Sequence, residues 1–247
     1  MTEIIMDLNR ILEKQKVYNQ GKGKIDVVTL SSYEKDFELT FTHNSTAIEG
    51  NTLTLMETKV VLEDGISVGG KELREIYEVI NHRKAYQYVK KCIAEGKVLD
   101  EHIVKDIHAI LTENIIVGGI YRNQEVRISG AGHVPPAGND MYNQIKKFYT
   151  DLVWKKGILN PIEYAAWTHA EFVRIHPFID GNGRTSRLLM NYQLMSDGFL
   201  PVSIAKENRL DYYNALEAYA VQGELEQFAD LVAELEEDQL DAYIKLI

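Results

Sequence analysis

Apolar residues recur every three to four positions along most of the chain, and this spacing predicts amphipathic α-helices. The clearest predicted helix spans 71–95, and its apolar face is formed by Leu73, Ile76, Tyr77, Ile80, Ala85, Tyr88 and Val89. The same spacing predicts helices over 3–17, 33–48, 55–63, 100–114, 139–156, 161–175, 182–197, 208–222 and 224–246. Polar N-cap residues indicate helix starts at Asp100, Asn139, Asn160 and Asn208. We therefore expect an all-α helical bundle.

One segment departs from the helical pattern. In IYRNQEVRISGAGHVPP, residues 120–136, side chains alternate around Val126 and Ile128, and glycines and two prolines follow. Alternation followed by turn residues predicts a short β-hairpin, or flap, on the helical body. Because no repeat or linker interrupts the chain, we expect one domain over 1–247. Its parts would be N-terminal helices over about 1–65, a core over about 66–235 and a C-terminal helix over 224–247.

Composition narrows the function classes. The chain is 45% hydrophobic and 26% charged, which is typical of soluble globular proteins, and its formal net charge of −10 argues against nucleic-acid binding. The single cysteine, Cys92, cannot form an internal disulfide, which fits a reducing compartment. No secretion leader or membrane-length apolar run is evident. We expect a cytoplasmic protein without membrane partners. No zinc-binding spacing occurs, so His102 and His108 are expected to be surface or satisfied polar residues.

The stretch HPFIDGNGRTSR, residues 176–187, holds the densest candidate chemistry. Pro177 should end the preceding helix, and the glycines of 181–183 stand directly before the next one. Backbone N–H groups at such a helix start, together with the helix dipole, form an anion site suited to phosphate. Arg184 and Arg187 lie three residues apart, where both guanidinium groups can bind phosphate oxygens.

Two further side chains of this stretch suit catalysis at a phosphate. Asp180 lies beside the predicted anion site, and a carboxylate there is a natural ligand for Mg²⁺, which shares its oxygen ligands with substrate phosphates. His176 precedes the turn, and histidine is the side chain best suited to accept a hydroxyl proton near neutral pH. Taken singly, each feature also fits an ordinary turn or helix end.

The same stretch resembles, without a mismatch, the HPFx[DE]GNGRxxR signature of the Fic (Fido) family. The resemblance extends to GIYRNQEVRISGAGHVPPAG and RLDYYNAL and covers about residues 35–235. It implies an all-α Fic fold with a flap beside the active site. It also implies an enzyme that transfers AMP from ATP to a Ser, Thr or Tyr hydroxyl of a target protein, and of itself, releasing pyrophosphate.

The resemblance implies a role for each matching residue. His176 would be the catalytic base, and Asp180 would bind Mg²⁺, with Mn²⁺ as an alternative. The ATP phosphates would be held by Gly181, Asn182, Gly183, Arg184, Thr185, Ser186 and Arg187. Tyr212 and Tyr213 would lie on the adenine side. The unknown target protein would dock by strand addition on the flap, at Ile128, Ser129, Gly130 and His133.

The stretch STAIEGN, residues 45–51, resembles the family's inhibitory [S/T]xxxE[G/N] motif, in the class II type with the motif N-terminal to the active site. Ser45 and Glu49 are four residues apart and share one side of a helix, with Gly50 at its C-terminal end. The Glu49 carboxylate is expected to make a bidentate contact with Arg187 and so keep the γ-phosphate of ATP from it. Glu49 would then inhibit the enzyme from within the same chain, and we call this inhibitory contact the brake.

Several alternatives remain open at this point. Glu49 could instead position a water that removes AMP, which would make the enzyme bifunctional or predominantly de-AMPylating. The fold could transfer from another donor, such as a phosphocholine or UMP donor. It could also be an inactive module that binds peptides on its flap. A homodimer through 55–63 or the C-terminal helix is a further possibility. The tryptophans Trp154 and Trp167 are expected in the core.

Overall fold

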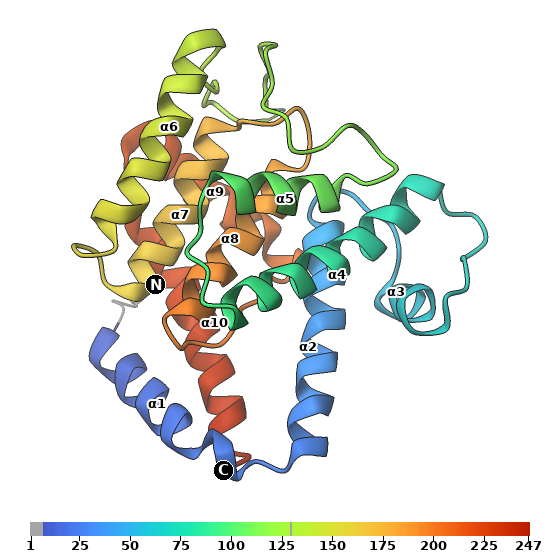
Figure 1. Cartoon of the computed structure of the whole chain (residues 1–247), viewed down its shortest axis with the longest axis vertical. Coiled ribbons are helices and arrows are strands. Elements are labelled where there is room, and N and C mark those ends of the chain that lie inside the picture. The colour runs from blue at the N-terminus through green and yellow to red at the C-terminus, as the bar shows by residue number, and fades with distance from the viewer. Residues whose placement is uncertain (1–6, 129) are drawn as a thin grey trace.

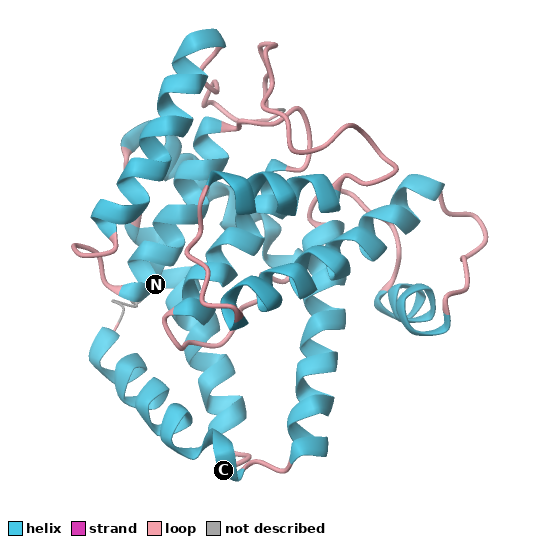
Figure 2. Cartoon of the chain, in the orientation of Figure 1, coloured by secondary structure: helices cyan, strands magenta, loops and turns pink. Residues whose placement is uncertain are grey.

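The computed structural model describes residues 7–128 and 130–247, and within these residues every regular element is a helix (Figures 1 and 2). The α-helices are α1 (Leu8–Gly21), α2 (Val27–Ala47), α3 (Leu55–Lys59), α4 (Leu73–Ala94), α5 (Glu101–Leu111), α6 (Gly138–Lys155), α7 (Pro161–Ile175), α8 (Asn182–Ser196), α9 (Arg209–Gln222) and α10 (Glu226–Ile244). Short helical turns cover η1 (Lys22–Lys24), η2 (Val60–Asp64) and η3 (Lys206–Asn208). The all-α prediction is confirmed. The predicted start at residue 3 lies outside the described residues.

The hairpin of α7 and α8 stands at the centre of the bundle (Figure 1). One buried cluster packs α4, α5 and α6 against it and includes Phe172 and Leu188. A second buried cluster packs α1, α9 and α10 against the other side and includes Ala166 and Leu194. Because both helices are enclosed on opposite sides, the turn that joins them, 176–181, is held by a rigid frame.

Helix starts follow the predicted caps in part. Asp100 caps α5 by accepting a hydrogen bond from the Ile103 N–H at 2.9 Å. Asn160 caps α7 in a reciprocal capping box, and Pro161 is the first helical residue. By contrast, α6 begins at Gly138, before Asn139, and Asn208 stands at the start of α9 without a side-chain cap.

The predicted β-hairpin is wrong, because the described part of 120–136 forms no strand. Two side chains, Arg122 from within the segment and Glu217 from α9, bond to its backbone in place of a cross-strand ladder. Arg122 donates to the carbonyls of Gln124 and Pro136, and Glu217 accepts from the N–H groups of Gly132 and His133. The flap, defined as residues 127–136, is therefore an anchored loop. Ser129, a predicted docking residue, lies outside the described residues.

Two smaller expectations also need correction. Trp154 is 73% exposed on the outer side of α6, whereas Trp167 is 4% exposed and belongs to the core. The predicted helix 55–63 is divided into α3 and the π-helical turn η2, which ends at the left-handed Gly65. Of the helices that the structure describes, none is long and apolar enough to cross a bilayer.

Candidate active site

The turn between α7 and α8 fixes His176 in an unusual conformation. α7 ends at Ile175, as Pro177 predicts, and His176 is left-handed with φ 51° and ψ 57°. Its N–H donates to the Phe172 carbonyl at 3.0 Å. The Asn182 side chain closes the turn, since its amide oxygen accepts from the Phe178 N–H and its amide nitrogen donates to the Phe178 carbonyl, both at 2.9 Å. Asn182 therefore shapes the loop, and only its backbone N–H remains for an anion.

The start of α8 presents the predicted anion site. Gly181 is left-handed, with φ 78°, and the next three residues, 182–184, have no backbone partner for their N–H groups in the described structure. Arg184 is 1% exposed, and its Nε makes no hydrogen bond within the described residues. Buried donors without partners beside a helix N-terminus fit a phosphate group. The side chains of Thr185 and Ser186 are fully buried.

Asp180 lies at the edge of this anion site. Its carboxylate accepts from the Gly181 N–H at 2.6 Å, lies 3.2 Å from Nη2 of Arg184 and pairs with Arg74 of α4. Burial raises the pKa of Asp180, but the charges of Arg184 and Arg74 and the Gly181 N–H outweigh burial and leave the pKa lowered. Asp180 is therefore ionised at neutral pH.

This carboxylate fits a hard divalent cation. Among the described residues, no group of three or more histidine, cysteine or acidic side chains could hold a metal unaided. Mg²⁺ and Mn²⁺ accept one carboxylate when substrate phosphates and water complete the shell. Arg74, whose side chain is 51% exposed, can move away from Asp180 to make room.

The His176 imidazole is prepared to accept a proton. Its pKa is lowered to about 4, because burial and, to a smaller extent, the charge of Arg122 outweigh the opposing effects of the Val173 backbone, Glu49 and Asp180. Its Nδ1 has no hydrogen-bond partner among the described residues. The ring is therefore neutral at pH 7, which is the form that a general base requires.

His108 of α5 packs against the turn between α7 and α8, a contact that was not predicted from the sequence. Its ring stacks on Phe178 with centroids 3.6 Å apart. Its Nδ1 accepts from the Gly119 N–H at 2.8 Å, so Nε2 carries the proton and donates to the Asp180 carbonyl at 2.9 Å. The expectation of a satisfied polar residue holds, but His108 is 1% exposed rather than superficial. Its place beside Val104 and Leu111 on the apolar face of α5 was the available signal.

Arg187 of α8 is fully buried and surrounded by the segment that ends α2. Its Nε donates to Ser45 Oγ at 2.9 Å, and Nη2 donates to the Ser45 carbonyl at 2.7 Å and to Glu49 Oε1 at 2.8 Å. The expected Glu49–Arg187 contact is present but is not bidentate, because Nε donates to Ser45 and Nη1 donates to Tyr212. Glu49 lies in the turn just after α2.

The same carboxylate also covers the start of α8. A Cβ atom placed on Gly183 would lie 2.2 Å from Glu49 Oε1, so only glycine permits this approach. A carboxylate that contacts both a helix N-terminus and Arg187 occupies a position suited to a phosphate.

Behind Arg187 lies a buried polar network. The Tyr212 hydroxyl accepts from Arg187 Nη1 at 3.1 Å and lies 3.0 Å from His169 Nε2. Ser186 Oγ lies 3.1 Å from the same nitrogen of His169, which sequence reasoning did not assign to the site. Tyr212 is 1% exposed, whereas Tyr213 is 43% exposed and donates to the Ile48 carbonyl. The adenine-side roles of both tyrosines stay predictions.

The flap lies against the C-terminal end of α7. His133 Nε2 is 2.9 Å from the Arg174 carbonyl, two residues before His176, and the His133 N–H donates to Glu217 at 3.0 Å. Ile128 is half-buried and Gly130 is exposed. The flap therefore lies close to the turn between α7 and α8.

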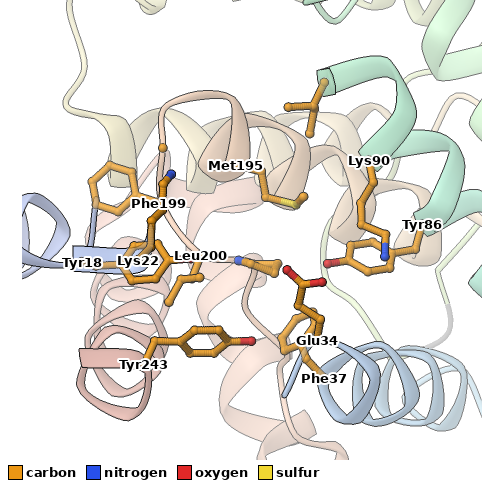
Figure 3. Close-up of a pocket in the computed structure, with 13 residues that line it drawn as sticks. Tyr18, Lys22, Glu34, Phe37, Tyr86, Lys90, Met195, Phe199, Leu200 and Tyr243 are labelled. Carbon is orange, nitrogen blue, oxygen red and sulfur yellow. The ribbon is translucent and has the colours of Figure 1, made fainter. Parts of the chain in front are cut away.

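A separate cavity of about 210 Å³ opens between α1, α2, α4 and α10 (Figure 3). The phenol rings of Tyr18, Tyr86 and Tyr243, the carboxylate of Glu34 and the ring of Phe37 line it. None of the residues predicted for the site lies there.

The helical bundle and the turn between α7 and α8 are similar to those of known proteins. Residues 98–194 match the model of the Fic/DOC family. The protein adenylyltransferase Fic of Nematostella vectensis is 40% identical over 206 residues, which are 82% of this chain and 48% of that protein. The protein of the same name from Drosophila persimilis is 37% identical over 205 residues, covering 82% and 40%. The chain thus spans less than half the length of the curated relatives it matches.

Solved structures agree with the sequence match. A Fic domain containing signaling protein from Bacteroides thetaiotaomicron superposes with a TM-score of 0.85 at 26% identity, over 96% of each chain. Fic-1 from C. elegans gives a TM-score of 0.83 at 28% identity, over all of this chain and 74% of that one. The segment 98–194 therefore belongs to the Fic/DOC family, and the chain as a whole has the fold of these Fic structures.

Proposed function

We propose that this protein is a self-inhibited adenylyltransferase of the class II type. It transfers AMP from ATP to a Ser, Thr or Tyr hydroxyl of a target protein, and to itself. The observation that carries this proposal is the α7–α8 turn, where a neutral His176, an ionised Asp180 and the unpartnered N–H groups of 182–184 meet. The names of the curated relatives support AMP transfer in particular.

The chemistry follows from the positions of these groups. His176 accepts the proton of the target hydroxyl, and the hydroxyl oxygen forms a bond to the α-phosphorus of ATP. The bond between the α-phosphorus and the bridging oxygen to the β-phosphate breaks, and pyrophosphate leaves. The N–H groups at the start of α8 and the guanidinium of Arg184 stabilise the charge that develops on the phosphates. Arg187 would bind the γ-phosphate.

Asp180 would hold Mg²⁺ or Mn²⁺. When bound, the cation neutralises charge on the phosphate oxygens as pyrophosphate leaves. Arg74 and Arg184 keep the Asp180 carboxylate ionised before the metal arrives. His108 Nε2 donates to the Asp180 carbonyl at 2.9 Å and so helps to hold the Asp180 backbone.

The brake is the Glu49 carboxylate. Arg187 cannot bind a γ-phosphate while it donates to Glu49 and Ser45, and the same carboxylate lies over Gly183. ATP that binds beside Glu49 would be held with its α-phosphate poorly aligned for in-line attack. A displacement of ~1 Å at the reacting atoms lowers a rate on the order of a hundredfold. Because Glu49 belongs to the same chain, no separate inhibitor is needed.

The target would dock on the flap by adding an extended segment beside it. Glu217 already occupies the N–H groups of Gly132 and His133. Pairing therefore uses the other part of the flap, near Ile128 and Gly130. The flap is held at the C-terminal end of α7, just before His176, through the contact of His133 with the Arg174 carbonyl.

The proposal is tested with the Glu49→Gly variant and ATP labelled at either the α- or the γ-phosphate, with Mg²⁺. Protein labelling from α-labelled ATP alone is the expected result, because the γ-phosphate leaves in pyrophosphate. The matched control is Glu49→Gly combined with His176→Ala, which should not become labelled. Labelling from the γ-phosphate, or labelling that survives loss of His176, would contradict AMP transfer by this site.

A further inference from the structure

Arg122 is a buried cation without a carboxylate partner. Its side chain is almost entirely buried, 2% exposed, and it forms no ion pair within the described residues. Burial lowers the pKa of its guanidinium, although it stays charged at neutral pH. Burying a guanidinium costs free energy of folding unless its N–H groups form hydrogen bonds. The partners of the Arg122 N–H groups therefore indicate what this side chain does.

All of the hydrogen bonds of Arg122 go to main-chain carbonyls around the catalytic turn. Nε donates to the His176 carbonyl at 2.7 Å, and Nη2 donates to the Pro136 carbonyl at 2.5 Å. Nη1 donates to the Gln124 carbonyl at 2.7 Å. The backbone N–H of Arg122 also donates to the Pro177 carbonyl at 2.9 Å. One side chain therefore ties the catalytic histidine to both ends of the loop that forms the flap.

We propose that Arg122 is a positioning residue for the transfer reaction, setting the His176 backbone and the flap in one fixed relation. His176 is a non-glycine residue in the left-handed region, a conformation that persists only when its surroundings hold it. The carbonyl of His176 and that of Pro177 are the groups that Arg122 holds. The Arg122 guanidinium thus orients both the backbone of His176, which is the proposed base, and the flap, on which the target hydroxyl would be presented.

The geometry separates this role from ATP binding. None of the hydrogen bonds of Arg122 reaches residues 181–187, which are predicted to hold the phosphates. Loss of Arg122 should therefore slow transfer without weakening ATP binding. A lysine at this position keeps the charge but cannot span the separated carbonyls, because its donors lie on one nitrogen.

The test compares Arg122→Lys and Arg122→Gln, each in the Glu49→Gly background, with Arg174→Lys as the matched control. Arg174 lies on α7 close to the turn, but its guanidinium pairs with Glu171 and Gln144. Rates of self-labelling and the ATP concentration for half-maximal rate are measured alongside the melting temperature. We expect both Arg122 variants to fall about 10- to 100-fold in maximal rate. Half-saturation by ATP should stay within about twofold of the background, and Arg174→Lys should leave both quantities unchanged.

A second readout separates positioning from general damage. Because the charge of Arg122 lowers the pKa of His176, the acidic limb of the pH–rate profile should move to higher pH in Arg122→Gln. The inference rests on the proposed function, and an unlabelled Glu49→Gly protein would overturn that function instead. An unchanged maximal rate in Arg122→Lys would overturn the positioning role. A lower rate that is accompanied by equally weakened ATP binding and by a lower melting temperature would also overturn the positioning role, because it would indicate general damage to the fold.

Discussion

The carboxylate of Glu49 lies 2.8 Å from Nη2 of Arg187, although the two residues are 138 positions apart in the chain. Arg187 is 1% exposed, and its pKa is raised because contacts with Tyr212 and Glu49 outweigh the effect of burial. A negative group therefore already fills the place where Arg187 and the start of α8 favour a phosphate. The proposed inhibition by Glu49 rests on this contact.

Ser45→Ala should release the brake only in part. The change removes the hydroxyl that accepts from Arg187 Nε at 2.9 Å, but the Ser45 carbonyl and Glu49 remain in contact with Nη2. A hydrogen bond from a charged donor contributes about 1.5–3 kcal/mol, and Arg187 keeps its other contacts, so self-labelling should rise roughly 10-fold and stay below that of Glu49→Gly. Thr46→Ser, which alters a neighbouring hydroxyl residue bonded to Thr42, serves as the control. Full release by Ser45→Ala would contradict the account.

Tyr212→Phe should destabilise the fold more than Tyr213→Phe. The Tyr212 hydroxyl is buried between Arg187 and His169, so its loss leaves polar groups without a partner and costs about 1–3 kcal/mol. Tyr213 is 43% exposed, and water can replace its contact with Ile48 at a cost below about 1 kcal/mol. Urea unfolding of the two variants measures the difference. Equal midpoints would show that the buried network does not stabilise Arg187.

The parts of the fold set by local chemistry were predictable from the sequence. Pro177 marked the end of α7, and Asn160 marked its start, because breaking and capping act between near neighbours. The contacts of Arg122 with the His176 carbonyl and of His108 with the Asp180 carbonyl were not predictable, since these partners are 54 and 72 positions away in the chain. The flap was misread as a hairpin for the same reason. The role of Glu49 was predicted only through a family resemblance, not from spacing alone.

The acidic limb of the pH–rate profile should lie far below the usual histidine range. The pKa of His176 is lowered from 6.5 to about 4, so the base is lost only as the pH falls through about 4. The value of kcat/KM for Glu49→Gly should be level between about pH 8 and 6. Because the pKa of His176 is lower in the folded chain, the unfolded chain binds a proton there at a higher pH than the folded chain does. The contribution of His176 to the free energy of unfolding is therefore fully present above pH 6.5 and is lost as the pH falls toward 4. Circular dichroism at each pH shows whether the protein is still folded. A limb near 6.5 with the fold intact would contradict the assignment.

Arg74→Ala should lower the Mg²⁺ concentration that gives half-maximal transfer in the Glu49→Gly background. Arg74 pairs with Asp180 and competes with a cation for it. Exposed ion pairs contribute about 0.2–1 kcal/mol, so the expected decrease is roughly 1.5- to 5-fold. Arg83→Ala, which removes an arginine of the same helix paired with Glu38, is the matched control. An increased Mg²⁺ requirement in Arg74→Ala would mean that Arg74 assists the metal site.

The central claim, that Glu49 restrains an AMP-transferring site, is tested most directly by one comparison. The initial rate of protein labelling from α-labelled ATP is measured for the unaltered protein and for Glu49→Gly at equal concentration, with ATP and Mg²⁺ saturating. The account predicts a rate on the order of a hundredfold higher in the variant, because Arg187 is then free to align the phosphates. Equal rates in two proteins that both bind ATP would contradict it.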